Sequence, residues 1–215
     1  MNLKVGLEAG FEGLRLYPGW ISTAAQRDLV ELVTLAMTEA PPYRPLMPRT
    51  RKPWSILQTN LGPLGWLSGE KDYFYGPHHP MTHKTWPVLP PALLKIWADL
   101  AGYDAPPECC LVNIYQGEKA RMGLHQDRDE ATFDAPVVSI SLGDTCVFRV
   151  GGFSRSDKTK SFRLASGDVV VLGGPSRMRF HGVDRILPGS SQLLTGGGRL
   201  NLTLRRVSDP SAMGQ

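Results

Sequence analysis

His125 and Asp127 stand two residues apart in the segment LHQDRDE, and a further histidine, His181, occurs in RFHG. Side chains two apart on an extended strand point to the same side, so the first pair can reach one metal ion. A His-x-Asp pair alone is common, and the additional histidine is what favours a metal site. Two histidines and one carboxylate are the facial triad of non-haem iron(II) oxygenases, which leaves coordination positions open for cosubstrate and dioxygen.

The C-terminal segment RLNLTLR alternates between polar and apolar residues. Period two places its polar residues together on one face of a strand: Arg199, Asn201, Thr203 and Arg205. Guanidinium groups bind carboxylates through paired, charge-assisted hydrogen bonds, so this face suits a small dianion such as 2-oxoglutarate. The alternative interpretation is a strand whose polar face is exposed to solvent.

These motifs must be positioned by secondary structure. From about residue 109 onward the sequence consists of short runs of β-branched and aromatic residues, which are separated by Gly, Asp, Ser or Pro and are typical of strands. We expect strands at residues 110–115, 122–127, 137–142, 145–150, 161–165, 168–172, 177–181 and 199–207. Two amphipathic helices are expected before them, at residues 22–38 and 92–101, and both are interpreted as packing elements. This order predicts a mainly β protein with flanking helices, built as a β-sandwich or jelly roll.

Residues 40–90 are dense in Pro, Gly, aromatic and basic residues and show no sustained helical period. We expect long ordered loops or short hairpins here, and such loops in a compact domain are usually functional, which favours a substrate-binding lid. Its basic run, Arg44, Arg49, Arg51 and Lys52, suits phosphate contact or, alternatively, is a solvated loop. No cysteine or carboxylate stands at zinc-site spacing from the histidines of HHPMTH. We therefore expect these histidines to lie on the surface of the lid without binding zinc.

The length of 215 residues fits one domain, which we expect to span residues 1–215. The 24 basic and 20 acidic residues give a net charge of +4, which mildly favours an anionic partner such as nucleic acid. No apolar run approaches the roughly 20 residues of a membrane helix and no secretory pattern is found, so we expect a cytoplasmic protein that spans no membrane. The three cysteines are expected to be buried, reduced thiols.

Together these motifs resemble those of the AlkB-type iron(II)- and 2-oxoglutarate-dependent dioxygenases, in particular the bacterial nucleic-acid repair branch. The resemblance is carried by NIY, LHQDRDE, PVVSISLG, GDVVVLGG, RFHG and RLNLTLR, whose order and approximate spacing match over residues 40–207. It implies a double-stranded β-helix, a jelly-roll variant, with a β core at residues 109–207 and a nucleotide-recognition lid at residues 40–90.

The resemblance also implies a role for each matching side chain. Fe(II) would be held by His125, Asp127 and His181. Arg205 would pair with the distal carboxylate of 2-oxoglutarate, and Arg199 would help to hold the carboxylate near the metal. Further cosubstrate contacts would come from Asn113, Tyr115 and Asn201. Contacts to the base or the nucleic acid would come from Trp66, Tyr73, Asp129 and Arg155.

The implied activity is oxidative N-demethylation of alkylated bases such as 1-methyladenine and 3-methylcytosine. It would be coupled to decarboxylation of 2-oxoglutarate by O2, releasing formaldehyde and succinate. A base must leave the stack to reach a buried iron, so single-stranded DNA is the expected substrate, with RNA, or duplexes through base flipping, as further candidates. Related jelly rolls act on other molecules, so a hydroxylase or demethylase of a protein or small molecule is the alternative. A monomer is expected.

Two residues depart from the family pattern. Leu172, in VVVLGG, stands where the bacterial pattern has tryptophan, and Gln58, in SILQTN, stands where that pattern has an apolar lid residue. We therefore expect the volume beside the iron and the selectivity for the base to differ. The metal ligands and both arginines are retained.

Overall fold

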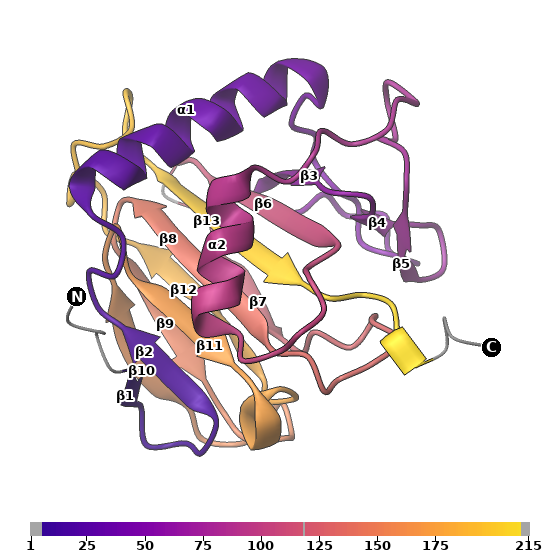
Figure 1. Ribbon diagram of the computed structural model, residues 1–215. Helices are drawn as coiled ribbons and strands as arrows, with labels where there is room; N and C mark the ends of the chain where they lie inside the picture. The colour runs from indigo at the N-terminus through magenta and orange to yellow at the C-terminus, as the bar shows by residue number, and fades with distance from the viewer. Residues whose placement is uncertain (1–5, 118, 212–215) are drawn as a thin grey trace.

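The larger of the two main β-sheets joins strands from the N-terminal and C-terminal parts of the chain (Figure 1). The computed structural model describes residues 6–117 and 119–211. The larger sheet has the order β1 (Leu7–Glu8), β2 (Leu14–Tyr17), β11 (Val169–Leu172), β8 (Val137–Gly143), β13 (Arg199–Arg205), β6 (Cys109–Tyr115) and β3 (Leu57–Leu61). The smaller sheet has the order β10 (Lys160–Leu164), β9 (Cys146–Val150), β12 (His181–Ile186) and β7 (Met122–His125). A separate hairpin consists of β4 (Gly65–Ser68) and β5 (Tyr73–Gly76).

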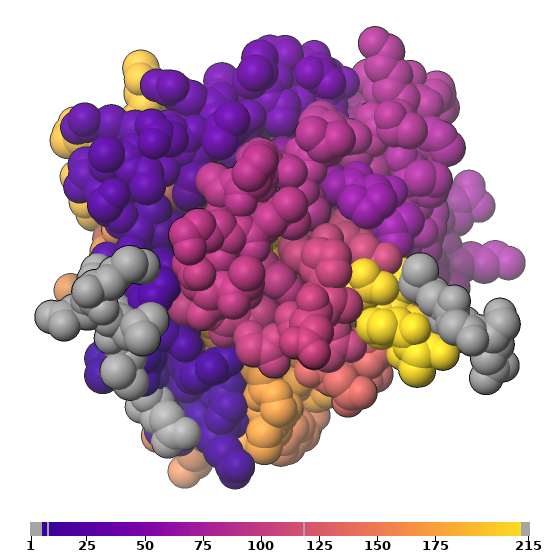
Figure 2. Space-filling model, in the orientation of Figure 1, coloured from indigo at the N-terminus to yellow at the C-terminus, as the bar shows by residue number. Residues whose placement is uncertain are grey.

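Both predicted helices are present and cover one face of the larger sheet. α1 (Thr23–Glu39) begins after Ser22, whose side chain accepts a hydrogen bond from the backbone N–H of Ala25. α2 (Pro91–Leu100) begins at a proline, whose missing N–H is not needed in a first turn. Apolar side chains of both helices pack with the leucines of β13 in one core cluster. Figure 2 shows that the helices and the segments beside them cover much of this side of the molecule.

The two faces of β13 have different surroundings, since one contributes to this core and the other faces the space between the sheets. Its leucines point toward the helices, and the alternation of the strand turns its four polar side chains to the opposite face. Each of these four residues is at most 8% exposed, so the alternative of a solvent-exposed face is wrong. A second apolar cluster, which includes Val137, Val170 and Phe148, joins the larger sheet to the smaller one.

The expected jelly roll is confirmed, with differences in individual strands. Residues 177–181 do not form a strand, because β12 starts only at His181, after the 3-10 helix Gly174–Ser176. Their alternating sequence RMRFH imitates a strand, but the Arg177 side chain is buried and donates to the backbone carbonyl of Asp127. Residues 40–90 are also less loop-like than expected, since β3 is an integral strand of the larger sheet.

The three cysteines, Cys109, Cys110 and Cys146, are buried and free, as expected. Burial raises the pKa of the Cys109 thiol to about 12. Within the described parts of the chain, neither helix is long and apolar enough to cross a membrane.

Candidate active site

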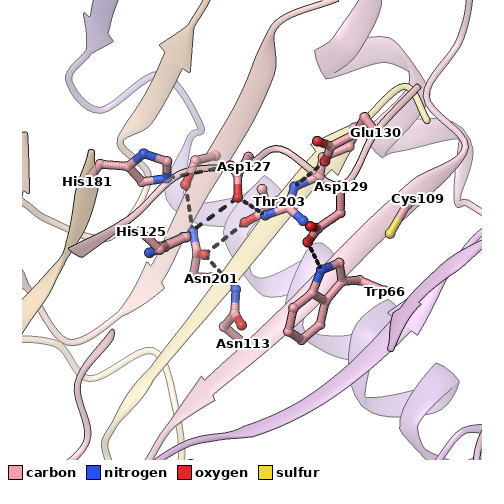
Figure 3. A network of polar contacts seen from close by, with 12 residues as sticks. Trp66, Cys109, Asn113, His125, Asp127, Asp129, Glu130, His181, Asn201 and Thr203 are labelled. Atoms are coloured by element: carbon pink, nitrogen blue, oxygen red, sulfur yellow. Dashed lines mark hydrogen bonds and ion pairs between the residues drawn. The ribbon is translucent and has the colours of Figure 1, made fainter. Parts of the chain in front are cut away.

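His125, Asp127 and His181 converge in the space between the sheets (Figure 3). His125 is the last residue of β7 and His181 is the first residue of β12, and the two are paired across these antiparallel strands. Asp127 follows two residues after the end of β7. One possible ligand atom from each side chain lies within 4.8 Å of the other two, so a single metal ion can bridge them.

The backbone orients both imidazoles. Nδ1 of His125 donates to the carbonyl oxygen of Gly123 and Nδ1 of His181 donates to that of Arg179, each at 3.0 Å. The Nε2 atoms of His125 and His181 keep their lone pairs and lie 3.6 and 3.5 Å from carboxylate oxygens of Asp127. Metal-ligating histidines are typically held through their other ring nitrogen in this way. Burial and the neighbouring His181 lower the pKa of His125 to about 4, which favours the neutral form that binds metals.

Asp127 uses one oxygen to bind Arg205 and keeps the other available. Its Oδ1 accepts a hydrogen bond from Nη2 of Arg205 at 2.6 Å, whereas the buried Oδ2 has no hydrogen-bond partner among the residues that the structure describes. Burial acts to raise the pKa of this carboxyl, but the Arg205 guanidinium and the two histidines hold it well below its ordinary value. A buried carboxylate oxygen without a donor is unfavourable unless a cation binds it, so the three side chains fit an iron(II) ion.

A network of buried charged groups supports Arg205 and was not predicted from the sequence. The Tyr75 hydroxyl donates to Oε1 of Glu130 at 2.6 Å and accepts from Nη1 of Arg205 at 3.0 Å. Glu130 also pairs with Arg177, whose Nη2 lies 3.1 Å from Oε2. Burial raises the pKa of Tyr75 well above its ordinary value, so the hydroxyl keeps the proton that it donates. The network connects the β4–β5 hairpin to the metal ligands.

The polar face of β13 runs from the metal ligands to Arg199. A strand rises about 3.3 Å per residue, so the backbones of Arg199 and Arg205 lie roughly 20 Å apart. Arg199 is 2% exposed, and its Nη2 donates to Oγ of Ser141 at 2.8 Å. Within the described ranges its Nε has no hydrogen-bond partner. Arg205, and not Arg199, contacts a metal ligand. This contact places Arg205, rather than Arg199, beside the metal ligands.

A cavity of about 1080 Å³ is lined by the triad, by aromatic residues of the 40–90 segment and by polar side chains of β6 and β13, namely Asn113, Tyr115, Asn201, Thr203 and Arg205. Pockets of this size hold cofactors and other small ligands. Trp66, which was expected to contact the base, lines the cavity, is 6% exposed and stacks on Tyr73, with ring centroids 4.6 Å apart. The Trp66 indole Nε1 donates to Oδ2 of Asp129 at 2.9 Å (Figure 3). Arg155 is exposed, lines the cavity and lies over the ring of Phe180.

The basic run and the histidines of the lid have different surroundings. Arg49 is exposed and lines the cavity, which is compatible with phosphate contact. His79 does not lie on the surface of the lid, because it is fully buried. Its Nδ1 accepts hydrogen bonds from the backbone N–H groups of Met81 and Thr82, and its Nε2 donates to the carbonyl oxygen of Pro41. Apart from the triad, no group of residues with metal-binding spacing is found in the described ranges.

The amino-acid sequence was compared with those of known proteins and protein families. Residues 13–205 match the model of the 2OG-Fe(II) oxygenase superfamily. The chain belongs to this superfamily. The oxygenase is 56% identical over 195 residues to the alpha-ketoglutarate-dependent dioxygenase AlkB homolog of Caulobacter vibrioides, across 91% of this chain and 88% of that protein. It is 45% identical over 111 residues to the DNA N(6)-methyladenine demethylase ALKBH1D of Arabidopsis thaliana, across 46% of this chain and 24% of that protein.

A solved structure supports the same relationship. The structure of OsALKBH1 matches the oxygenase with a TM-score of 0.79 and 31% identity, covering 93% of this chain and 99% of that one. The oxygenase is thus an AlkB-type, Fe(II)- and 2-oxoglutarate-dependent dioxygenase, as the motifs predicted. Its cofactor is iron(II), held by His125, Asp127 and His181, and its cosubstrates are 2-oxoglutarate and dioxygen.

Proposed function

We propose that the oxygenase removes N-linked methyl groups from alkylated bases in single-stranded DNA, with RNA as a second candidate. The single observation that carries this proposal is the cavity, in which an iron triad lies beneath aromatic side chains and exposed arginines. The Arabidopsis relative, named as a demethylase of N(6)-methyladenine in DNA, supports a methylated base as the substrate class. Bound iron(II) supplies the activation of dioxygen that couples oxidation of the methyl group to decarboxylation of 2-oxoglutarate. The products are the repaired base, formaldehyde, succinate and carbon dioxide.

In this proposal, the arginines bind the two ends of 2-oxoglutarate. Arg205 holds the carboxylate beside the metal, because its guanidinium already contacts Asp127. Arg199 holds the distal carboxylate at the other end of β13. Among the described residues, the buried Nε of Arg199 has no hydrogen-bond partner, which supports an anionic ligand at that position. The remaining cosubstrate contacts come from Asn113 and Tyr115, and Asn201 positions Asn113 by accepting a hydrogen bond from its Nδ2.

The damaged base enters the cavity only after it leaves its stack, which favours single strands over duplexes. Trp66 and Tyr73 provide an aromatic surface for it, and stacking of this kind is worth about 1–3 kcal/mol per base. Asp129 binds Trp66 through one oxygen, so its second oxygen remains available for an amino group or for the positive charge of 1-methyladenine or 3-methylcytosine. Arg155 and Arg49 contact the phosphates.

We further infer that the oxygenase is a cytoplasmic monomer. Its free, buried cysteines support a reducing compartment. Light scattering of the purified protein tests the oligomeric state, because a dimer would double the measured mass.

Mass spectrometry of a methylated single-stranded oligonucleotide tests the activity. The protein is loaded with iron(II) without oxygen and then incubated with the oligonucleotide, 2-oxoglutarate and air. Loss of the mass of one CH2 group with formation of succinate, both abolished in His125→Ala, is expected. If succinate forms but neither adenine nor cytosine lesions lose mass, the substrate is instead a protein or a small molecule.

A further inference from the structure

Three carboxamide side chains form a chain of hydrogen bonds across neighbouring strands of the larger sheet. Gln58 on β3 is paired with Asn113 on β6, which is paired with Asn201 on β13. Nε2 of Gln58 donates to Oδ1 of Asn113 at 2.7 Å, and Nδ2 of Asn113 donates to Oδ1 of Asn201 at 3.2 Å. All three residues line the cavity of the active site.

A backbone carbonyl fixes the direction of this chain. Nδ2 of Asn201 donates to the carbonyl oxygen of Ile140 at 3.0 Å, and a carbonyl can only accept. Oδ1 of Asn201 is thereby turned to Asn113, and the Thr203 hydroxyl also donates to it. A carboxamide has one donor end and one accepting end, so Asn113 must present its oxygen to Gln58. The nitrogen of Gln58 is committed to this bond, and its carbonyl must face elsewhere.

The carbonyl oxygen of Gln58 is consequently an acceptor that lacks a donor. Gln58 is 1% exposed, and its buried Oε1 has no hydrogen-bond partner in the part of the chain that the structure describes. Buried acceptors are rarely left unpaired, so a ligand that carries an N–H or O–H group fits this position. Ionised 2-oxoglutarate offers acceptors only. An N–H group of the substrate can supply this donor.

We infer that Oε1 of Gln58 accepts a hydrogen bond from the exocyclic amino group of the base, and that Gln58 thereby selects adenine and cytosine lesions. The inference rests on the proposed function and adds to it a residue that determines specificity. A base with a carbonyl in place of the amino group would set two acceptors against each other. An unconstrained glutamine could turn its nitrogen toward such a base. Gln58 cannot do so without breaking its bond to Asn113.

A matched pair of substrates tests this role. 3-Methylcytosine and 3-methyluracil carry the methyl group at the same ring position and differ in an amino group against a carbonyl. Both are placed in the same single-stranded oligonucleotide, and kcat/KM is measured for the wild type, Gln58→Met and Gln58→Leu. We expect the preference for 3-methylcytosine to fall about 10-fold in both variants, as for the loss of one hydrogen bond, with the KM for 2-oxoglutarate unchanged. The positive charge of 3-methylcytosine is the same in every variant and cancels from the comparison.

Ser55→Ala is the control, because Ser55 also lines the cavity but its hydroxyl is already paired with the backbone of Arg121. Its substrate preference should equal that of the wild type. An unchanged preference in both Gln58 variants overturns the inference. So does an equal loss on both substrates with a raised KM for 2-oxoglutarate, since Gln58 would then act only through Asn113. If the wild type demethylates neither oligonucleotide, the proposed function fails and the inference fails with it.

Discussion

Arg205 and Asp127 form a buried ion pair, with Nη2 and Oδ1 2.6 Å apart, that makes the two oxygens of the carboxylate unequal. One oxygen is held by the guanidinium, and the other is left for the metal. The same guanidinium contacts the hydroxyl of Tyr75 in the β4–β5 hairpin. Arg205 therefore links the iron site to the β4–β5 hairpin.

Arg205→Ala should weaken iron binding as well as raise the KM for 2-oxoglutarate. Removal of one partner from a buried ion pair costs about 3–5 kcal/mol, because Asp127 is left uncompensated. Urea unfolding and anaerobic equilibrium dialysis with iron(II) measure the two effects. Arg199→Ala is the comparison: Arg199 is remote from the metal, so this variant should raise the KM but keep the iron affinity within about twofold. Equal losses of iron affinity in both variants would contradict this assignment.

Asp127→Asn should abolish metal binding while preserving the shape of the side chain. The amide has no charge to offer a cation, and it leaves Arg205 without its carboxylate. Cobalt(II) serves as the probe, because its visible absorption spectrum reports coordination by the protein. A wild-type cobalt spectrum and affinity in this variant would remove Asp127 from the ligand set.

His125 should titrate far below an ordinary histidine in the metal-free protein. Its pKa falls from 6.5 to about 4 through burial and the nearby His181. Between pH 4 and pH 6.5, His125 is protonated more in the unfolded state than in the folded state. The contribution of His125 to the free energy of unfolding is therefore complete above pH 6.5 and is lost as the pH falls toward 4. NMR titration of the imidazole, assigned by its disappearance in His125→Asn, measures the pKa. Titration near 6.5 would show that the site does not favour the neutral ring.

Glu130→Gln should destabilise the fold by about 3 kcal/mol, because it leaves the buried Arg177 without its charged partner. Asp99→Asn is a matched control at an exposed pair with Lys95, where a loss below about 0.5 kcal/mol is expected. Urea unfolding of both variants gives the comparison. Similar values for the two would mean that the network around Arg205 contributes no more than a surface ion pair.

Gly182→Ala should impair metal binding although it changes no ligand. A Cβ at Gly182 would lie 2.5 Å from the carbonyl oxygen of Met122 and 2.8 Å from that of Gly123, so β12 and β7 must separate, and with them His181 and His125. Gly123→Ala is the control, since a Cβ there meets nothing within 4 Å. Cobalt affinity should fall in the first variant and stay at the wild-type value in the second. Unchanged affinity in Gly182→Ala would show that the strands adjust without moving the ligands.

The iron triad and the polar face of β13 could be predicted because their signals are local. His125 and Asp127 share one short motif, and alternation along RLNLTLR already separates Arg199 and Arg205 from the leucines. The support around Arg205 has no such signal. Glu130 bonds to Tyr75 across 55 residues of sequence and to Arg177 across 47, so only the tertiary fold brings them together.

The errors have similar causes. Residues 177–181 alternate like a strand, yet Arg177 turns inward to the backbone of Asp127. β3 is a short strand in a segment rich in proline and glycine, and its place in the larger sheet depends on pairing with β6. The contact between Arg205 and Asp127 was also not predicted, because it depends on where Asp127 meets β13. Spacing within β13 cannot supply that information.

The burial of the cysteines has a consequence for an enzyme that activates dioxygen. Cys109 lies opposite Arg205 in the register of β6 and β13, close to the oxidising centre. Oxidants attack the thiolate form of cysteine, and burial, which raises the pKa of Cys109 to about 12, keeps this thiol protonated. The pKa of Cys110 is raised in the same way. Burial thus protects the thiols of Cys109 and Cys110 from oxidation by the enzyme's own reaction.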